Sequence, residues 1–99
     1  MSMAELKQNA AGVIDVSGTL GFGLVVDLLS SSQRFFSGQT DLVFDLAGVE
    51  KTDSAGLALM VEWMLMAQES GQTISFRAIP KQMLDIARVS GLDGILPIV

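Results

Sequence analysis

Apolar and polar residues follow each other along this chain in patterns that predict four strands and three helices. Residues 4–9 form a short edge strand, and residues 12–17 form a better one because they are rich in β-branched side chains. Residues 41–46 are mostly apolar, as expected of a central strand that helices cover. Residues 73–78 alternate apolar with polar side chains, which predicts a half-buried strand.

Apolar residues at helical spacing predict the helices. The first spans about residues 22–36, although its serine run favours a helix less than the flanking residues do. The clearest helix spans residues 54–70, and a third spans about residues 80–90. The glycine-rich residues 18–23 are expected to form a loop, and the apolar residues 92–99 are expected to fold back onto the core.

The order of these elements implies one α/β domain. A chain of 99 residues without internal repeats or linkers forms a single domain over residues 1–99. Alternation of strands and helices implies a mostly parallel sheet packed by helices.

Composition narrows the possible functions. The chain is 49% hydrophobic, which is high for a small domain, so a partner is expected to cover part of its surface. A net charge of −5 argues against binding to nucleic acid and to anionic lipid headgroups. The N-terminal residues lack a signal-peptide pattern, and no apolar run approaches the ~18 residues that span a bilayer. We therefore expect a cytoplasmic protein without direct membrane insertion.

The residues that usually carry catalysis are absent or badly spaced. The chain has no cysteine and no histidine, which removes the commonest nucleophile, general base and metal ligands. The glycine loop at residues 18–23 matches neither standard phosphate-binding spacing and has no lysine beside it. Asp45 and Asp53 are close only in sequence, and Ser54 lacks a base. We expect no enzyme activity, no cofactor and no metal.

Ser54 nevertheless stands at a chemically useful place, the N-terminus of the predicted helix 54–70. Either Ser54 or Asp53 can act as the N-cap, and Leu57 rules out a capping box that would settle the choice. If Asp53 is the cap, the Ser54 hydroxyl points outward. A phosphoryl group on Ser54 would sit at the positive end of the helix dipole, beside Asp53. The site can therefore be a contact or a switch.

Apolar residues lie on two sides of the predicted helix 54–70. A helical wheel places one stripe toward the core, comprising Leu57, Met60, Val61, Met64, Leu65 and Gln68. The opposite side should be polar, but it carries Ala55, Leu59, Trp63 and Met66. Either this domain covers both sides, or the second side binds another protein. We favour the binding face, because Trp and Met are enriched at interfaces.

Two segments resemble a known signature. Residues 45–49 (DLAGV) followed by residues 52–57 (TDSAGL) resemble the signature of STAS domains, named for sulfate transporters and anti-sigma factor antagonists. The resemblance extends over nearly the whole chain. It implies a mixed, mostly parallel sheet of about four to five strands with helices packed mainly on one side.

Two branches of this family imply different partners. In anti-sigma factor antagonists, the serine at the position of Ser54 is phosphorylated by an anti-sigma factor kinase. In the other branch, a free-standing subunit binds the ATPase of the Mla phospholipid ABC transporter, which maintains outer-membrane lipid asymmetry. Residues 56–59 (GLAL), Trp63 and the ending at residues 86–97 are more similar to the Mla subunit.

The resemblance therefore implies a non-enzymatic subunit, held at the inner membrane only through its partner ATPase. The sequence GTLG at residues 18–21 replaces a loop that often carries carboxylates, which argues further against nucleotide binding. The alternative is an anti-sigma factor antagonist with Ser54 as phosphoacceptor. The expected partner-binding residues are Thr52, Asp53, Ser54, Ala55, Gly56, Leu59, Trp63 and Met66.

Overall fold

The chain folds in the predicted order of strands and helices. The computed structural model describes residues 4–38 and 41–99. Its elements are β1 (Glu5–Gln8), β2 (Ile14–Leu20), α1 (Phe22–Ser32), the 3-10 helix η1 (Gln33–Phe36), β3 (Asp41–Thr52), α2 (Ser54–Ser70), β4 (Thr73–Arg77) and α3 (Lys81–Val89).

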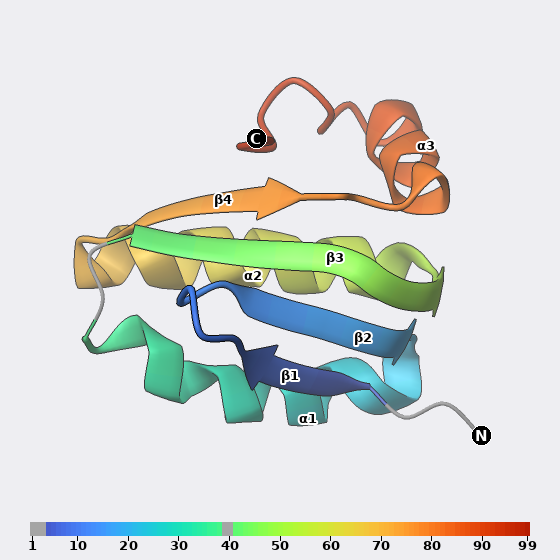
Figure 1. Cartoon of the computed structure of the whole chain (residues 1–99). Coiled ribbons are helices and arrows are strands. Elements are labelled where there is room, and N and C mark those ends of the chain that lie inside the picture. Colours follow the sequence, from blue (N-terminus) through green and yellow to red (C-terminus); the bar gives the residue numbers. More distant parts are fainter. Residues whose placement is uncertain (1–3, 39–40) are drawn as a thin grey trace.

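The four strands form one mixed sheet in the order β1-β2-β3-β4. β1 is antiparallel to β2, whereas β2, β3 and β4 are parallel to one another. In Figure 1, α2 crosses behind β3, while α1 lies beside β1 and α3 lies beyond β4. The near face of the sheet carries no helix within the described residues. The predicted α/β fold, with a mostly parallel sheet, is confirmed.

β3 is longer than the sequence predicted. It was expected to end at Leu46, but it continues to Thr52 because its second half pairs with β2. The pairing shifts register twice, and Gly48 lies opposite Ser17 at the first shift. A Cβ atom on Gly48 would lie 2.9 Å from the Ser17 Cβ, so only glycine lets the strands approach there. Asp45 therefore lies within the strand rather than at its end.

The first predicted helix is divided at its serine run. α1 ends at Ser32, and the next turn is the 3-10 helix η1. The Ser32 hydroxyl donates a 2.7 Å hydrogen bond to the Leu29 carbonyl, a local bond that competes with regular helix geometry.

The prediction that Leu59, Trp63 and Met66 form an exposed face is wrong. Trp63 is 0% exposed, Leu59 is buried, and Met66 is half-buried against the core. The Trp63 indole stacks on Phe44 of β3, with ring centroids 4.4 Å apart. The reason is that α2 packs on the sheet between α1 on one flank and α3 on the other, so this domain covers both of its apolar sides.

The buried arc of α2 is also rotated from the predicted stripe. Leu57 and Met60 are buried as expected, and Val61 and Met64 are half-buried. Leu65 is 46% exposed, and Gln68 is exposed. Small residues, Gly56 and Ala67, occupy buried positions on the same arc as Trp63, so the helix lies close to the sheet there.

The C-terminal tail folds back as predicted. Phe76 of β4 forms a parallel bridge with Ile98. The Phe76 N–H donates to the Pro97 carbonyl at 2.8 Å, and the Val99 N–H donates to the Phe76 carbonyl at 2.9 Å. Leu96 is buried in the core. The tail thereby covers part of the outer edge of β4.

Candidate functional site

The candidate site lies where β3 ends and α2 begins. Asp53 has extended backbone geometry, and its Oδ1 accepts a 2.8 Å hydrogen bond from the Ala55 N–H. The Asp53 carbonyl accepts from the Gly56 N–H at 3.0 Å. Asp53 is therefore the N-cap of α2, which decides between the two caps that the sequence allowed.

Ser54 is consequently free of any capping role. Its side chain is exposed, and within the described residues no hydrogen bond of its hydroxyl occurs. The hydroxyl stands on the first residue of α2, at the positive end of the helix dipole. It can donate and accept hydrogen bonds to a molecule that approaches this end.

Thr52 and Gly56 fix the geometry of the turn between β3 and α2 through close packing against each other. Thr52 is buried, and its hydroxyl lies 3.1 Å from the Asp53 carbonyl oxygen. A Cβ atom on Gly56 would lie 2.0 Å from the Thr52 Oγ1 and 3.1 Å from the Leu20 Cβ. The two residues therefore pack closely where no larger side chain fits, and this packing positions Ser54.

The first turns of α1 and α3 also meet this end of β3. The Asp53 N–H donates to the Leu20 carbonyl at 3.2 Å, next to the residue that precedes α1. The Thr52 N–H donates to the Oε1 of Gln82, in the first turn of α3, at 3.4 Å. The start of α2 is thus held from both sides, as expected at the carboxyl edge of parallel strands.

A shallow apolar groove begins at Ser54 and runs between α2 and the end of α3. We call it the α2–α3 groove, and its volume is about 390 Å³. The lining residues are Ser54, Leu57, Ala58, Val61, Glu62, Ser90 and Leu92. The lining is mainly apolar, and the free Ser54 hydroxyl lies at one end of it.

The eight predicted partner-binding residues are therefore separated by the fold. Ser54 alone is exposed, and Asp53 and Met66 are half-buried. The buried members are Thr52, Ala55, Gly56, Leu59 and Trp63. The structure keeps the loop end of the predicted surface and removes Leu59 and Trp63 from it.

The six lining residues of the α2–α3 groove other than Ser54 were absent from the sequence prediction as contacts. Ala58 and Glu62 are exposed and one helical turn apart on α2, and Leu92 follows α3. The signal available was their spacing from Ser54, since positions 54, 58, 61 and 62 share one side of a helix.

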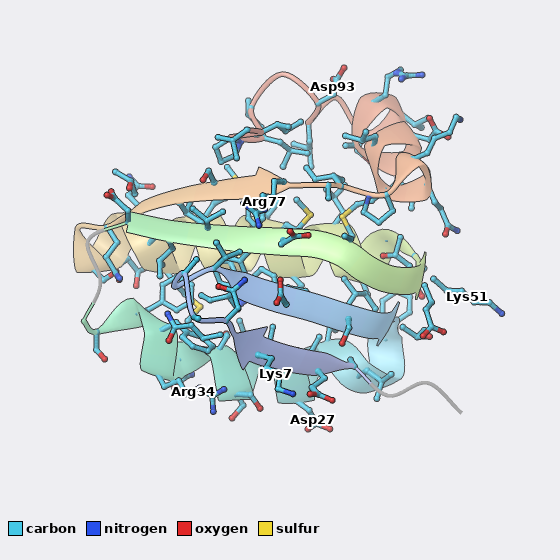
Figure 2. The ribbon with its side chains drawn as sticks, viewed as in Figure 1. Lys7, Asp27, Arg34, Lys51, Arg77 and Asp93 are labelled. Atoms are coloured by element: carbon cyan, nitrogen blue, oxygen red, sulfur yellow. The ribbon has the colours of Figure 1, made fainter. Side chains whose placement is uncertain are left out.

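Asp45 has no part in this site. It lies on the open face of the sheet, where its Oδ2 accepts a 2.8 Å ion-pair hydrogen bond from the Nε of Arg77, labelled in Figure 2. The Ala47 N–H donates to Asp45 Oδ1 at 2.8 Å. The Ala47 N–H, followed by Arg77, holds the pKa of Asp45 below its ordinary value of 3.8.

The described residues contain no group of three metal-ligating side chains. Among these same residues, no helix combines the length and apolarity needed to cross a bilayer.

Comparison with known proteins places this site in a family context. The family described as "Mlab, STAS domain" matches residues 3–98. No curated protein matches the sequence significantly.

Solved structures share the fold. The unphosphorylated anti-sigma factor antagonist SpoIIAA is 14% identical, with a TM-score of 0.72 over 97% of this chain and 87% of its own. An anti-sigma factor antagonist from Mycobacterium paratuberculosis is 19% identical, with a TM-score of 0.75 over 99% and 85% of the two chains. SLC26A9 is 18% identical, with a TM-score of 0.62 over 87% of this chain and 17% of its own.

The order of strands, the capped turn before α2 and the family match over residues 3–98 agree. The chain belongs to the STAS domain family, in the branch described as Mlab.

Proposed function

We propose that this chain is a non-enzymatic subunit that binds the ATPase of an Mla-type phospholipid ABC transporter and supports its assembly or activity. The observation that carries the proposal is the free Ser54 hydroxyl at the tip of α2, which opens directly onto the α2–α3 groove. The Mlab family match favours a transporter partner over other partners of STAS domains.

The docking surface proposed here differs from the one expected from sequence. It consists of Ser54 and the α2–α3 groove, mainly the exposed Ala58 and Glu62 and the half-buried Leu92. Apolar atoms of the groove would supply the buried contact area, and the Ser54 hydroxyl would supply a directional hydrogen bond. ATP hydrolysis belongs to the partner, and lipid handling belongs to other subunits. The chain would stay in the cytoplasm and reach the inner membrane only through the ATPase.

Affinity purification of the chain from its native cells, followed by mass spectrometry, tests the identity of the partner. Recovery of an ABC ATPase at a stoichiometric level supports the proposal. Recovery of a kinase-like anti-sigma factor without any ABC ATPase contradicts it.

Variants of Ser54 test the surface. Ser54→Asp should weaken binding of the purified ATPase by about tenfold or more, because it buries a charge at the contact. Ser54→Ala should weaken binding by only about twofold to tenfold, the value of one hydrogen bond. Ser37→Asp adds the same charge after η1, at the far end of the molecule from the start of α2, and should bind normally.

A second candidate function is that of an anti-sigma factor antagonist. The observation that favours it is the exposed and unbonded Ser54 hydroxyl, which a kinase can reach. In that case the partner kinase would phosphorylate Ser54, and Ser54→Asp and Ser54→Ala would have opposite effects on binding and release.

A further inference from the structure

A second apolar groove lies on the other side of α2. We call it the α1–α2 groove, and its volume is about 200 Å³. Six of its lining residues carry the argument: Phe22, Val25, Val26, Leu29, Ala58 and Glu62. Phe22 is 73% exposed and Val26 is 71% exposed, although both are large apolar side chains. Adjacent exposed side chains of this kind mark an interaction surface.

The shape of the groove suits a helix. Phe22, Val26 and Leu29 are spaced at i, i+4 and i+7, so they form a row about 10 Å long on α1. On α2 the opposing residue Ala58 is small and exposed, which leaves room for close approach. A groove between two helices, apolar along about two turns, accepts the apolar face of a third helix.

The charge of the two helices defines the chemistry of that third helix. α1 and α2 carry Asp27, Glu62 and Glu69 but no lysine or arginine. Glu62 lines the groove itself, and Asp27 projects outward from α1 in Figure 2. Ion pairs in the described part of the chain involve Asp45 and Asp85 and none of these three carboxylates. Their charge is available to lysine or arginine on a partner.

The same charges oppose a second copy of this chain as the occupant. Two copies meeting through the α1–α2 groove would bring the Glu62 carboxylate of each into a shared interface, in a protein whose net charge is −5. A partner with lysine or arginine beside its apolar stripe meets no such repulsion.

The α1–α2 groove adjoins the surface proposed above. Ala58 and Glu62 line both grooves, so they form a ridge between them. A partner that contacts Ser54 is therefore within one helical diameter, about 10 Å, of the second groove.

We propose that the α1–α2 groove is the docking site for a basic amphipathic helix of the partner protein. The proposal rests on the proposed function only in that the chain acts by docking, and it does not require the partner to be an ATPase.

The probe is a synthetic helical peptide of leucine and lysine with an apolar stripe at i, i+4 and i+7, titrated into the full-length chain. Methyl NMR should show the largest shifts at Val25, Val26 and Leu29. Val26→Asp should weaken binding by about tenfold or more. Val89→Asp is the matched control, because Val89 is 90% exposed on α3 outside both grooves, and its binding should change by less than about twofold.

A charge exchange tests the basic character of the occupant. Glu62→Lys should weaken binding of the lysine peptide. It should strengthen binding of a counterpart peptide that carries glutamate at every lysine position. Glu50→Lys makes the same change in net charge on β3, outside the grooves, and should alter both affinities much less. Thermal denaturation of each variant checks that it folds. If Val26→Asp does not fold, Phe22→Ser takes its place.

Several outcomes would overturn the proposal. The first is that the methyl NMR shifts map outside α1 and α2. The second is that Val26→Asp and Val89→Asp lose equal amounts of peptide affinity, and the third is that the chain binds the two peptides with equal affinity. Sedimentation that shows a dimer dissociated by Val26→Asp would make a second copy the occupant. If the ATPase binds the Val26→Asp variant normally but fails to bind the Ser54→Asp variant, the docking role of the α1–α2 groove is refuted. The proposed function would still stand in that case.

Discussion

The Nε1 of Trp63 donates a 2.8 Å hydrogen bond to the Oγ of Ser32, and both side chains are completely buried. The Ser32 hydroxyl in turn donates a 2.7 Å hydrogen bond to the Leu29 carbonyl. One serine thereby satisfies the indole N–H and ties the end of α1 to the middle of α2. This bond explains how a tryptophan with a polar atom fits in the core of so small a domain.

Ser32→Ala should destabilise the fold by about 1–3 kcal/mol, because it leaves the Trp63 N–H buried without an acceptor. Urea denaturation followed by circular dichroism measures the change. Ser31→Ala is the control, since Ser31 is exposed on the same helix, and it should have little effect. Equal stability of the two variants would mean that the indole finds another acceptor.

Trp63→Ala should cost about 3–5 kcal/mol, through lost burial and the cavity left beside Phe44. Leu65→Ala, on the exposed side of α2, should cost less than about 1 kcal/mol. Circular dichroism is the appropriate probe because Trp63 is the only tryptophan. A Trp63→Ala protein of normal stability that fails to bind its partner would restore the interface role that the structure removes.

Gly56→Ala should destabilise the chain by about 1–3 kcal/mol, because the new methyl group meets Thr52 and Leu20 at the start of α2. Gly23→Ala provides the contrast. A Cβ atom on Gly23 meets nothing within 4 Å, and alanine favours a helix, so this variant should gain up to about 1 kcal/mol. Opposite shifts in melting temperature are expected, and a melting temperature that Gly56→Ala leaves unchanged would contradict the close packing described here.

Asp45→Asn should lower stability at pH 7 by about 0.2–1 kcal/mol, since it removes a partly exposed ion pair with Arg77. The pKa of Asp45 is lowered in the folded state, so its stabilising effect is present above 3.8 and is lost as pH falls through the folded-state pKa. The difference between wild type and Asp45→Asn should therefore shrink as pH falls below this range. Denaturation curves at several pH values measure it, and a difference that grows in acid would contradict the assignment.

The strand and helix order and the capped turn before α2 were predictable because they depend on local patterns. Strand alternation, glycine at helix ends and the Asp53-Ser54 pair act over a few residues. The length of β3 was not predictable in this way, since its second half is a strand only through pairing with β2 at Gly48 and Thr52. That pairing depends on residues about 30 positions away in sequence.

The orientation of α2 was mispredicted for a related reason. Its apolar residues surround the helix, so periodicity does not identify one buried side. Two facts from elsewhere in the fold decide the orientation: Ser32 accepts the Trp63 N–H, and Gly56 allows contact with Thr52.

The capping of α2 by Asp53 has a consequence for how this surface can change. Because the helix start does not depend on Ser54, the residue at position 54 can be exchanged or modified with little loss of folding free energy. Under the proposed function, a change of this one side chain would alter affinity for the partner while the scaffold keeps its stability. Position 54 would then be a place where natural variation or protein engineering can change specificity without changing the architecture.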